Sequence, residues 1–157
     1  MEDFIAICKE RTTQAMDRFS LDLSFVPADK LTWSPTPTAK SALEIAAHCA
    51  GYSGSFASII RAGQFAWSVE EFRSTVQSAI DSITTLEEAE TMLRKGIADT
   101  IAALDTVKPE QVGSIIASPQ GQTPFNFFLT LPAMHLETHG AQLDYLQTCW
   151  GDLEVHF

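Results

Sequence analysis

The segment Met134-His135-Leu136-Glu137-Thr138-His139-Gly140-Ala141-Gln142-Leu143-Asp144-Tyr145 decides how the rest of the sequence is interpreted. Its hydrophobic spacing predicts an α-helix, on which His135 and His139 are neighbours one turn apart. Side chains at this spacing have Cβ atoms about 5–6 Å apart, so two imidazoles can reach one metal ion at about 2.0–2.1 Å each. Both histidines continue the apolar stripe of the helix, which predicts inward-pointing rings. Two half-buried, hydrogen-bonded histidines without a metal are the alternative.

A third histidine, His48, lies in the middle of another predicted helix. That helix begins at the capping box Ser41-Ala42-Leu43-Glu44 and continues to about Ala62. Its middle is rich in alanine and glycine, which predicts close approach of a neighbouring backbone. If the two helices pack side by side, His48 joins the other two histidines. Three imidazoles with water at the remaining position are the pattern of an open, catalytic type of metal site.

Polar side chains near the predicted ligands are candidates to orient an imidazole or to contact a substrate. Glu44 and Tyr52 lie one turn from His48 on either side, and Gln142 follows His139 by three residues. Glu44 is more simply explained by its role in the capping box. For Tyr52 and Gln142, a role in the site and a purely structural role explain the residue equally well.

A zinc-protease motif is not present around His135. That motif needs glutamate directly after the first histidine, and this position holds Leu136. Glu137 points elsewhere on the helix, since two residues correspond to about 200° of rotation. His156 falls in a region where fraying is common, and it is left out of the predicted site.

Four long helical segments are predicted, over residues 3–23, 41–62, 85–108 and 124–146. Residues 63–85 are interpreted as a long crossover, with a short helix after a cap at Ser68, and residues 112–124 as a loop with an abortive hairpin. Pro109 is expected to end the third helix, and Thr123 to cap the fourth, in which Pro132 introduces a kink or marks the true start. The prediction is an all-α four-helix bundle with a crossover between the second and third helices, forming one domain over residues 1–157.

The first helix is expected to bury one apolar face. That face consists of small or apolar residues at helical spacing, namely Phe4, Ile7, Cys8, Ala15, Phe19 and Leu23. All three cysteines, Cys8, Cys49 and Cys149, are interpreted as small core residues.

Composition excludes several classes of function. The formal net charge of −10 is opposite to what a nucleic-acid binder needs. No apolar run approaches the roughly 20 residues of a membrane span, and the acidic start of the chain does not resemble a signal peptide. An odd number of cysteines without a Cys-x-x-Cys motif favours a reducing, cytoplasmic location.

The sequence resembles the DinB-like (DinB/YfiT-type) superfamily of bacterial four-helix bundles over nearly its full length. The resemblance depends on Leu31-Thr32-Trp33-Ser34-Pro35, on the segment from Ser41 to His48, and on the segment from His135 to Leu143. One departure is Gly140, where many relatives have arginine. This departure puts a role for that arginine in doubt here, but not the metal site.

The resemblance implies an up-down-down-up helix order and a divalent metal, often nickel or zinc, bound by His48, His135 and His139. Iron or manganese are further candidates, since imidazole ligands do not select one metal. The resemblance also implies a homodimer. Some relatives are transferases that use low-molecular-weight thiols, whereas others are isomerases or hydrolases.

Three hypotheses for function follow. The first is a metal-dependent thiol S-transferase that acts on small electrophiles. The second is a non-catalytic metal-binding or stress-response bundle, which would use the same three ligands without an accessible cavity. The third is a helical bundle that binds no metal.

Overall fold

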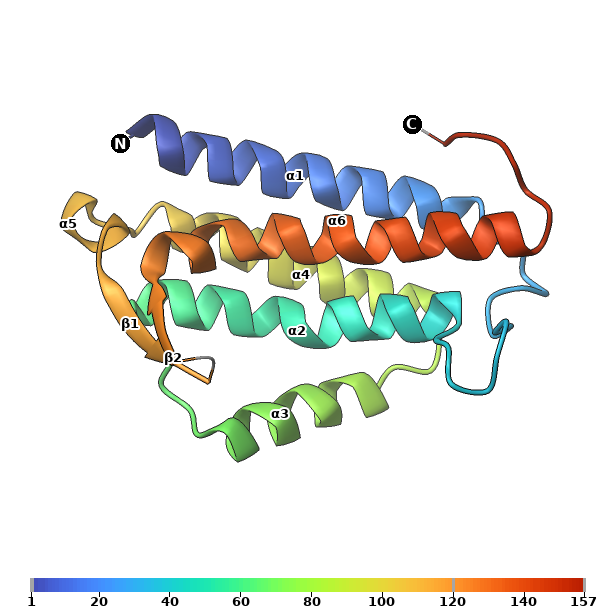
Figure 1. Cartoon of the computed structure of the whole chain (residues 1–157), viewed down its shortest axis with the longest axis horizontal. Coiled ribbons are helices and arrows are strands. Elements are labelled where there is room, and N and C mark those ends of the chain that lie inside the picture. The colour runs from blue at the N-terminus through green and yellow to red at the C-terminus, as the bar shows by residue number, and fades with distance from the viewer. Residues whose placement is uncertain (1, 120, 157) are drawn as a thin grey trace.

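The protein is a bundle of four long helices, with a further helix packed on its outside (Figure 1). In the computed structural model, which describes residues 2–119 and 121–156, the bundle helices are α1 (Glu2–Ser24), α2 (Ala42–Ala62), α4 (Leu86–Leu104) and α6 (Phe125–Cys149). The predicted all-α four-helix bundle is therefore confirmed. None of the described helices is both long and apolar enough to cross a bilayer.

The four bundle helices have the expected up-down-down-up directions. α1 and α6 run one way along the bundle, whereas α2 and α4 run the other way (Figure 1). Because α2 and α4 are parallel neighbours, the chain must return between them, and α3 (Val69–Asp81) makes this return along the outside of α2. The up-down-down-up topology with a long crossover is confirmed, and α3 is the short helix predicted after Ser68.

α2 is packed against three other helices, α4, α6 and α3, while α1 packs on α6 and α4. α1 and α2 therefore occupy opposite corners of the bundle. Two apolar clusters fill its interior, and burial of each large side chain contributes about 1.5–3 kcal/mol. The cluster toward the start of α2 includes Phe19, Ile45, Leu93, Leu136 and Leu143, and the cluster toward its end includes Ile60, Leu104, Phe125 and Leu129.

Capping boxes define where three of the helices begin. Ser41 Oγ accepts from the Glu44 amide at 3.3 Å, and the Glu44 carboxylate accepts from the Ser41 amide at 2.7 Å. Ser68 and Glu71 start α3 in the same way, and Thr85 and Glu88 start α4. These reciprocal bonds satisfy amides that have no partner inside the helix, which is why the sequence signal was reliable.

The region before α6 differs from its prediction. α4 ends at Leu104, and Pro109 is the first residue of a short helix, α5 (Pro109–Val112), rather than the end of the preceding one. The expected abortive hairpin is a formed two-stranded antiparallel sheet, β1 (Ile115–Ser118) with β2 (Gly121–Pro124). Thr123 lies in β2 next to Ser118 Oγ, 2.8 Å away, so it does not cap α6.

Two expectations about helix faces are also wrong, and one of the two alternatives for Pro132 is excluded. Ile7 is 57% exposed, because the buried face of α1 passes through Cys8 instead. Cys8 and Cys49 are buried as predicted, but Cys149, the last residue of α6, is exposed. Pro132 lies inside α6 and does not mark its start.

The small residues of α2 permit close packing at specific points. A Cβ atom on Gly51 would lie 2.6 Å from Ile80 Cγ1 of α3, and a Cβ atom on Gly96 of α4 would overlap the Ser53 side chain of α2. At Gly54, by contrast, no atom lies within 4 Å of the corresponding position. The predicted close approach is therefore confirmed at Gly51 and wrong at Gly54.

Alanine substitutions at two helical glycines should have opposite effects. Gly96→Ala is expected to destabilise the fold by about 1–3 kcal/mol, because α2 and α4 must separate. Gly54→Ala should stabilise it by about 0.5–1 kcal/mol, since it improves helix propensity in open space. Urea unfolding of both variants measures the difference. Equal changes in the free energy of unfolding would contradict this account of α2–α4 packing.

Candidate metal centre

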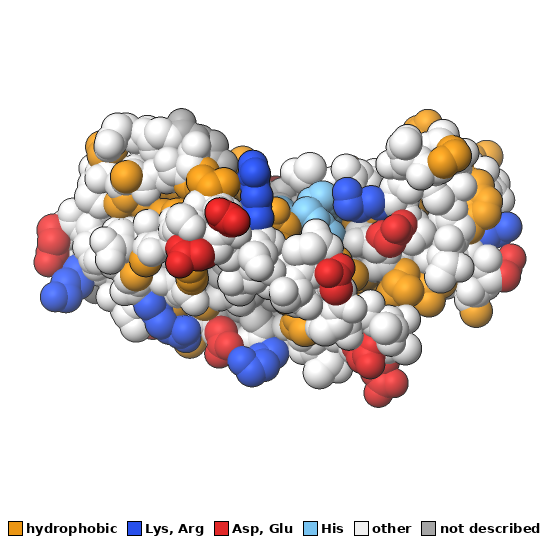
Figure 2. All heavy atoms as spheres, turned by 90° about the horizontal axis from the view of Figure 1, so that it is seen from below, with side chains coloured by type: hydrophobic (Ala, Val, Ile, Leu, Met, Phe, Trp, Pro, Cys, Tyr) orange, Lys and Arg blue, Asp and Glu red, His pale blue; other side chains and the backbone are white. Residues whose placement is uncertain are grey.

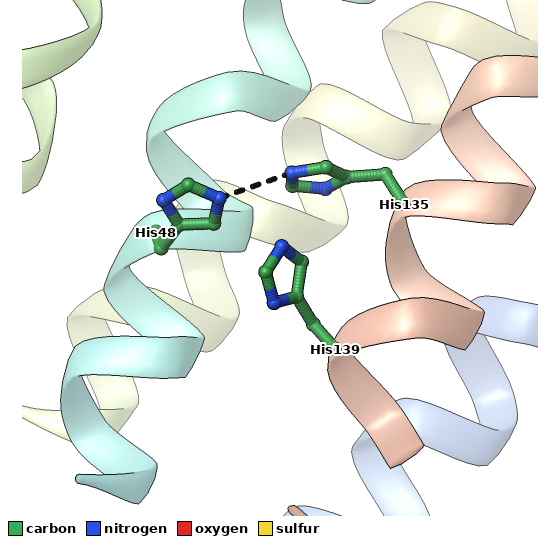
Figure 3. A group of neighbouring side chains, drawn as sticks. All are labelled: His48, His135 and His139. Atoms are coloured by element: carbon green, nitrogen blue, oxygen red, sulfur yellow. Dashed lines mark hydrogen bonds between the residues drawn. The ribbon is translucent and has the colours of Figure 1, made fainter. Parts of the chain in front are cut away.

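Three histidines converge from two helices that are far apart in sequence. His48 lies near the middle of α2, and His135 and His139 lie one turn apart on α6, which packs on α2. Figure 3 shows the three rings pointing toward one another across the space between these helices. The Nε2 atoms of His48 and His135 are 3.2 Å apart, and one ring nitrogen from each of the three residues lies within 4.8 Å of the others.

The orientation of His139 is fixed by a hydrogen bond on its outer side. Its Nδ1 lies 2.8 Å from Oε1 of Gln142, one turn further along α6. Because the amide oxygen only accepts, Nδ1 carries the proton and Nε2 keeps its lone pair. Gln142 therefore presents His139 toward the other two rings in the form that binds a metal.

Burial keeps the three rings uncharged. It lowers the pKa of His48 to about 4 and that of His135 to about 3, and in both cases the nearby ring of His139 adds to the effect. Burial also lowers the pKa of His139, although its hydrogen bond to Gln142 opposes the shift. The positive charge of Lys40 contributes to the lowering at His48 and His139. At neutral pH the site therefore offers three neutral nitrogen donors, which is the protonation state that metal binding requires.

The donor arrangement fits a transition metal. Two nitrogens held by one ion at about 2.0–2.1 Å and at angles of about 90–109° lie about 2.8–3.4 Å apart. The 3.2 Å between His48 and His135 falls in that range and also allows a hydrogen bond between the rings. Nδ1 of His135 is buried without a partner in the described part of the chain. Such burial costs free energy, and an ion held by Nε2 would leave this second nitrogen of the ring unpaired.

The histidines lie beside the buried stripe of α6 rather than on it. Leu136 and Gly140 face the core, whereas His135 and His139 are half-buried at its edge, facing α2. The prediction that His135 and His139 lie on the apolar stripe of α6 was therefore wrong: the two residues lie a fraction of a helical turn to one side of it. This shift leaves the nitrogens protected by α2 and α6 but still reachable from outside.

The other candidate residues divide as follows. Tyr52 packs its ring against His48 and His135, with centroids 4.7 and 5.2 Å away. The Glu44 carboxylate is held by the Ser41 amide, as its capping role predicts, although Glu44 also lines the cleft beside the site. Glu137 points away from the histidines and pairs with Arg11 on the surface.

His156 does not take part in this site. Its ring stacks on Phe25 at 3.7 Å, and Nε2 lies 2.9 Å from Asp152 Oδ2. It is therefore packed rather than frayed. Within the described residues, His48, His135 and His139 form the one cluster of His, Cys, Asp or Glu with metal-binding geometry.

A family model described as the DinB superfamily matches residues 9–143, which is most of the chain. The chain belongs to the DinB superfamily. None of the curated protein sequences compared with it is a significant match.

Solved structures show the same fold at low sequence identity. A DinB-like protein, YjoA, from Bacillus subtilis has a TM-score of 0.64 and 18% identity, over 99% of this chain and 96% of that one. A mycothiol-dependent maleylpyruvate isomerase has a TM-score of 0.70 and 12% identity, over 88% of this chain but 60% of that one. A histidine-to-alanine mutant of that isomerase matches with 11% identity. This DinB-superfamily chain thus spans less than two thirds of the isomerase.

The departure from the family pattern at Gly140 lies away from the site. A Cβ atom there would be 3.5 Å from Asp22 Oδ2 and 3.9 Å from Phe19, both on α1. The position therefore faces α1, whereas the neighbouring His139 faces α2. The glycine of this DinB-superfamily member consequently leaves the three imidazoles unaffected.

Of the three histidines, His48 lines a cleft between α2 and α3. The cleft has a volume of about 1140 Å³, and its lining includes His48, Tyr52, Lys40 and Arg73. Figure 2 shows histidine atoms at the bottom of a hollow on this face, with basic side chains on both sides. The site therefore has the access that a closed structural metal site does not have.

Sequence reasoning missed Lys40 and Arg73. Lys40 directly precedes the capping box of α2, and Arg73 lies on α3, a helix whose side-chain directions the sequence did not define. Both line the same cleft in this DinB-superfamily chain. The position of Lys40, directly before the cap of the helix that carries His48, could have placed it near the site. No local feature of the sequence could have done the same for Arg73.

The metal-free protein should lose stability on acidification through its histidines. The pKa values of His48 and His135, about 4 and about 3, lie below the usual value near 6.5. Between these values the unfolded chain binds more protons, so stability falls as pH falls through that window. In urea unfolding, the loss between pH 7 and pH 5 is expected to be smaller for His135→Phe than for the wild type. An equal loss would show that the rings are not neutral and buried.

Proposed function

We propose that this protein is a metal-dependent enzyme that transfers a low-molecular-weight thiol to small electrophiles. The observation that carries the proposal is the convergence of three neutral imidazoles, one of which, His48, lines an accessible cleft. His48, His135 and His139 are the proposed ligands, and water or substrate takes the remaining position. The mycothiol dependence of one similar structure supports a thiol as co-substrate.

Zinc or nickel is the proposed metal, with iron and manganese as further candidates, because imidazole nitrogen binds all of them. A bound cation lowers the pKa of a thiol, so that the reactive thiolate is present at neutral pH without a protein base. Gln142 holds His139 in the ligand tautomer, and Tyr52 limits the movement of the His48 and His135 rings.

The cleft carries two basic side chains, Lys40 and Arg73, and three acidic ones, Glu44, Glu70 and Asp81, and the proposal of an anionic thiol rests on the two basic ones. Lys40 and Arg73 have no salt-bridge partner within the described chain. Lys40 is close enough to affect the pKa of His48 and His139. Three neutral ligands do not compensate a divalent cation, and Lys40 adds further positive charge. A thiol that also carries a carboxylate would balance this charge.

The setting of the protein is part of the same proposal. The three free cysteines suit a reducing compartment, and we place the protein in the cytoplasm. The family resemblance supports a homodimer.

A non-catalytic metal-binding bundle is the alternative function, but it would not need a large cleft beside the ligands.

Metal binding is expected to depend on the three histidines. Protein purified without an affinity tag should contain about one zinc or nickel ion per chain, and His48→Ala should contain none. Added metal at 100 times Kd should stabilise the wild type by about 2.7 kcal/mol, since it binds only the folded state. Elemental analysis and thermal unfolding measure these effects. His156→Ala is the control, and equal metal loss in both variants would contradict the proposed ligand set.

Lys40 should recognise the charge of the thiol. Lys40→Ala is expected to raise KM for N-acetylcysteine about 1.4- to fivefold, which corresponds to the 0.2–1 kcal/mol of an exposed ion pair. KM for 2-mercaptoethanol, which has no charge besides its thiol, should stay the same. Steady-state kinetics of the metal-loaded protein test this, with Lys95→Ala as the control. An equal rise for both thiols would contradict charge recognition.

A further inference from the structure

A second cavity adjoins the histidines on the side of the hairpin. Its volume is about 560 Å³. It is lined by residues of α2, α3 and α6, by Phe65 in the connection before α3, and by the β1–β2 hairpin. Tyr52 lines both this cavity and the cleft that contains Lys40, and His135 lies at its edge. The lining is otherwise mainly aromatic or aliphatic and includes Phe56, Ile59, Phe65, Phe72, Phe127, Phe128 and Leu131.

The walls of this cavity are formed by aromatic rings that support one another. The ring of Phe72 on α3 lies 5.0 Å from Phe65 and 5.8 Å from Tyr52, measured between centroids. The ring of Phe56 on α2 meets His135 edge-on at 5.5 Å. Such contacts hold the lining in place, so the cavity is already shaped before a ligand enters.

The lining carries no acidic or basic side chain apart from His135, although the chain as a whole has a formal charge of −10. Small-molecule sites are typically concave and apolar, have volumes of about 300–1,000 Å³ and contain a few convergent polar groups. The cavity fits this description: its polar side chains are Thr123 on the hairpin and His135 and Tyr52, and the last two lie where it meets the proposed metal site.

We propose that this cavity binds the apolar part of the electrophilic substrate, an aromatic or branched alkyl group. The anionic thiol would occupy the neighbouring cleft, so the two substrates would meet at the histidines. This inference rests on the proposed function for the identity of the ligand, but the apolar binding site itself does not depend on metal or thiol.

Titration of the metal-free full-length protein with N-phenyl-1-naphthylamine, a neutral apolar fluorophore, tests the proposal. Saturable binding of one probe per chain is expected. Phe127 lines the cavity and is 40% exposed, so Phe127→Glu places a charge at the cavity without opening the core. This variant should bind the probe at least about tenfold more weakly, because binding would desolvate the new carboxylate.

Met134→Glu is the matched control, since Met134 is on the same helix, is 37% exposed and does not line the cavity. Its probe affinity should equal that of the wild type. If Phe127→Glu does not fold, as judged by circular dichroism, Phe65→Ser in the connection before α3 replaces it. Absence of saturable binding, or equal loss in variant and control, would overturn the proposal. Probe binding by a protein without thiol-transfer activity would refute only the proposed function.

Discussion

The structure depends on the close contact between α2 and α6, which forces three imidazoles into a space where they cannot all be charged. His48 and His135 approach to 3.2 Å, and two imidazolium ions at that distance would repel strongly. Burial and mutual proximity resolve the conflict by lowering the pKa values, so that the rings stay neutral. The same change makes them electron-pair donors. The packing of α2 on α6 therefore also sets the protonation state in which the three imidazoles can bind a metal.

The sequence predicted those features that have a local physical cause. Ser41 with Glu44, and Thr85 with Glu88, define helix starts because each pair satisfies amides within one turn. The spacing of His135 and His139 placed both on one face of a helix for the same kind of reason. The convergence with His48 needed a non-local assumption, that α2 and α6 are neighbours, which the family resemblance supported and the fold provides.

Predictions were wrong where a local pattern has a second acceptable conformation or depends on packing against another element. Thr123 and Pro124 match a helix start, but the pairing of β1 with β2 takes them into a strand. Pro109 begins α5 because proline is as acceptable at the first position of a helix as after its end. Arg73 and Phe72 could not be assigned to a site, since their directions depend on how α3 lies against α2.

Residues adjacent on α3 serve different surfaces. Phe72 lines the aromatic cavity and Arg73 lines the charged cleft, and the helix that carries both is attached to the bundle through α2. Small changes in how α3 is seated would therefore alter both sides of the histidine centre together. Gly51 sets that seating, because its missing side chain lets Ile80 approach α2.

The chain order of the helices has a consequence for biosynthesis. His48 is translated early, whereas His135 and His139 belong to α6, which follows every other helix. A nascent chain from which α6 has not yet emerged has at most one of the three nitrogen donors in place. If the protein binds the proposed ion, all three donors can hold it only after α6 has left the ribosome and packed on α2.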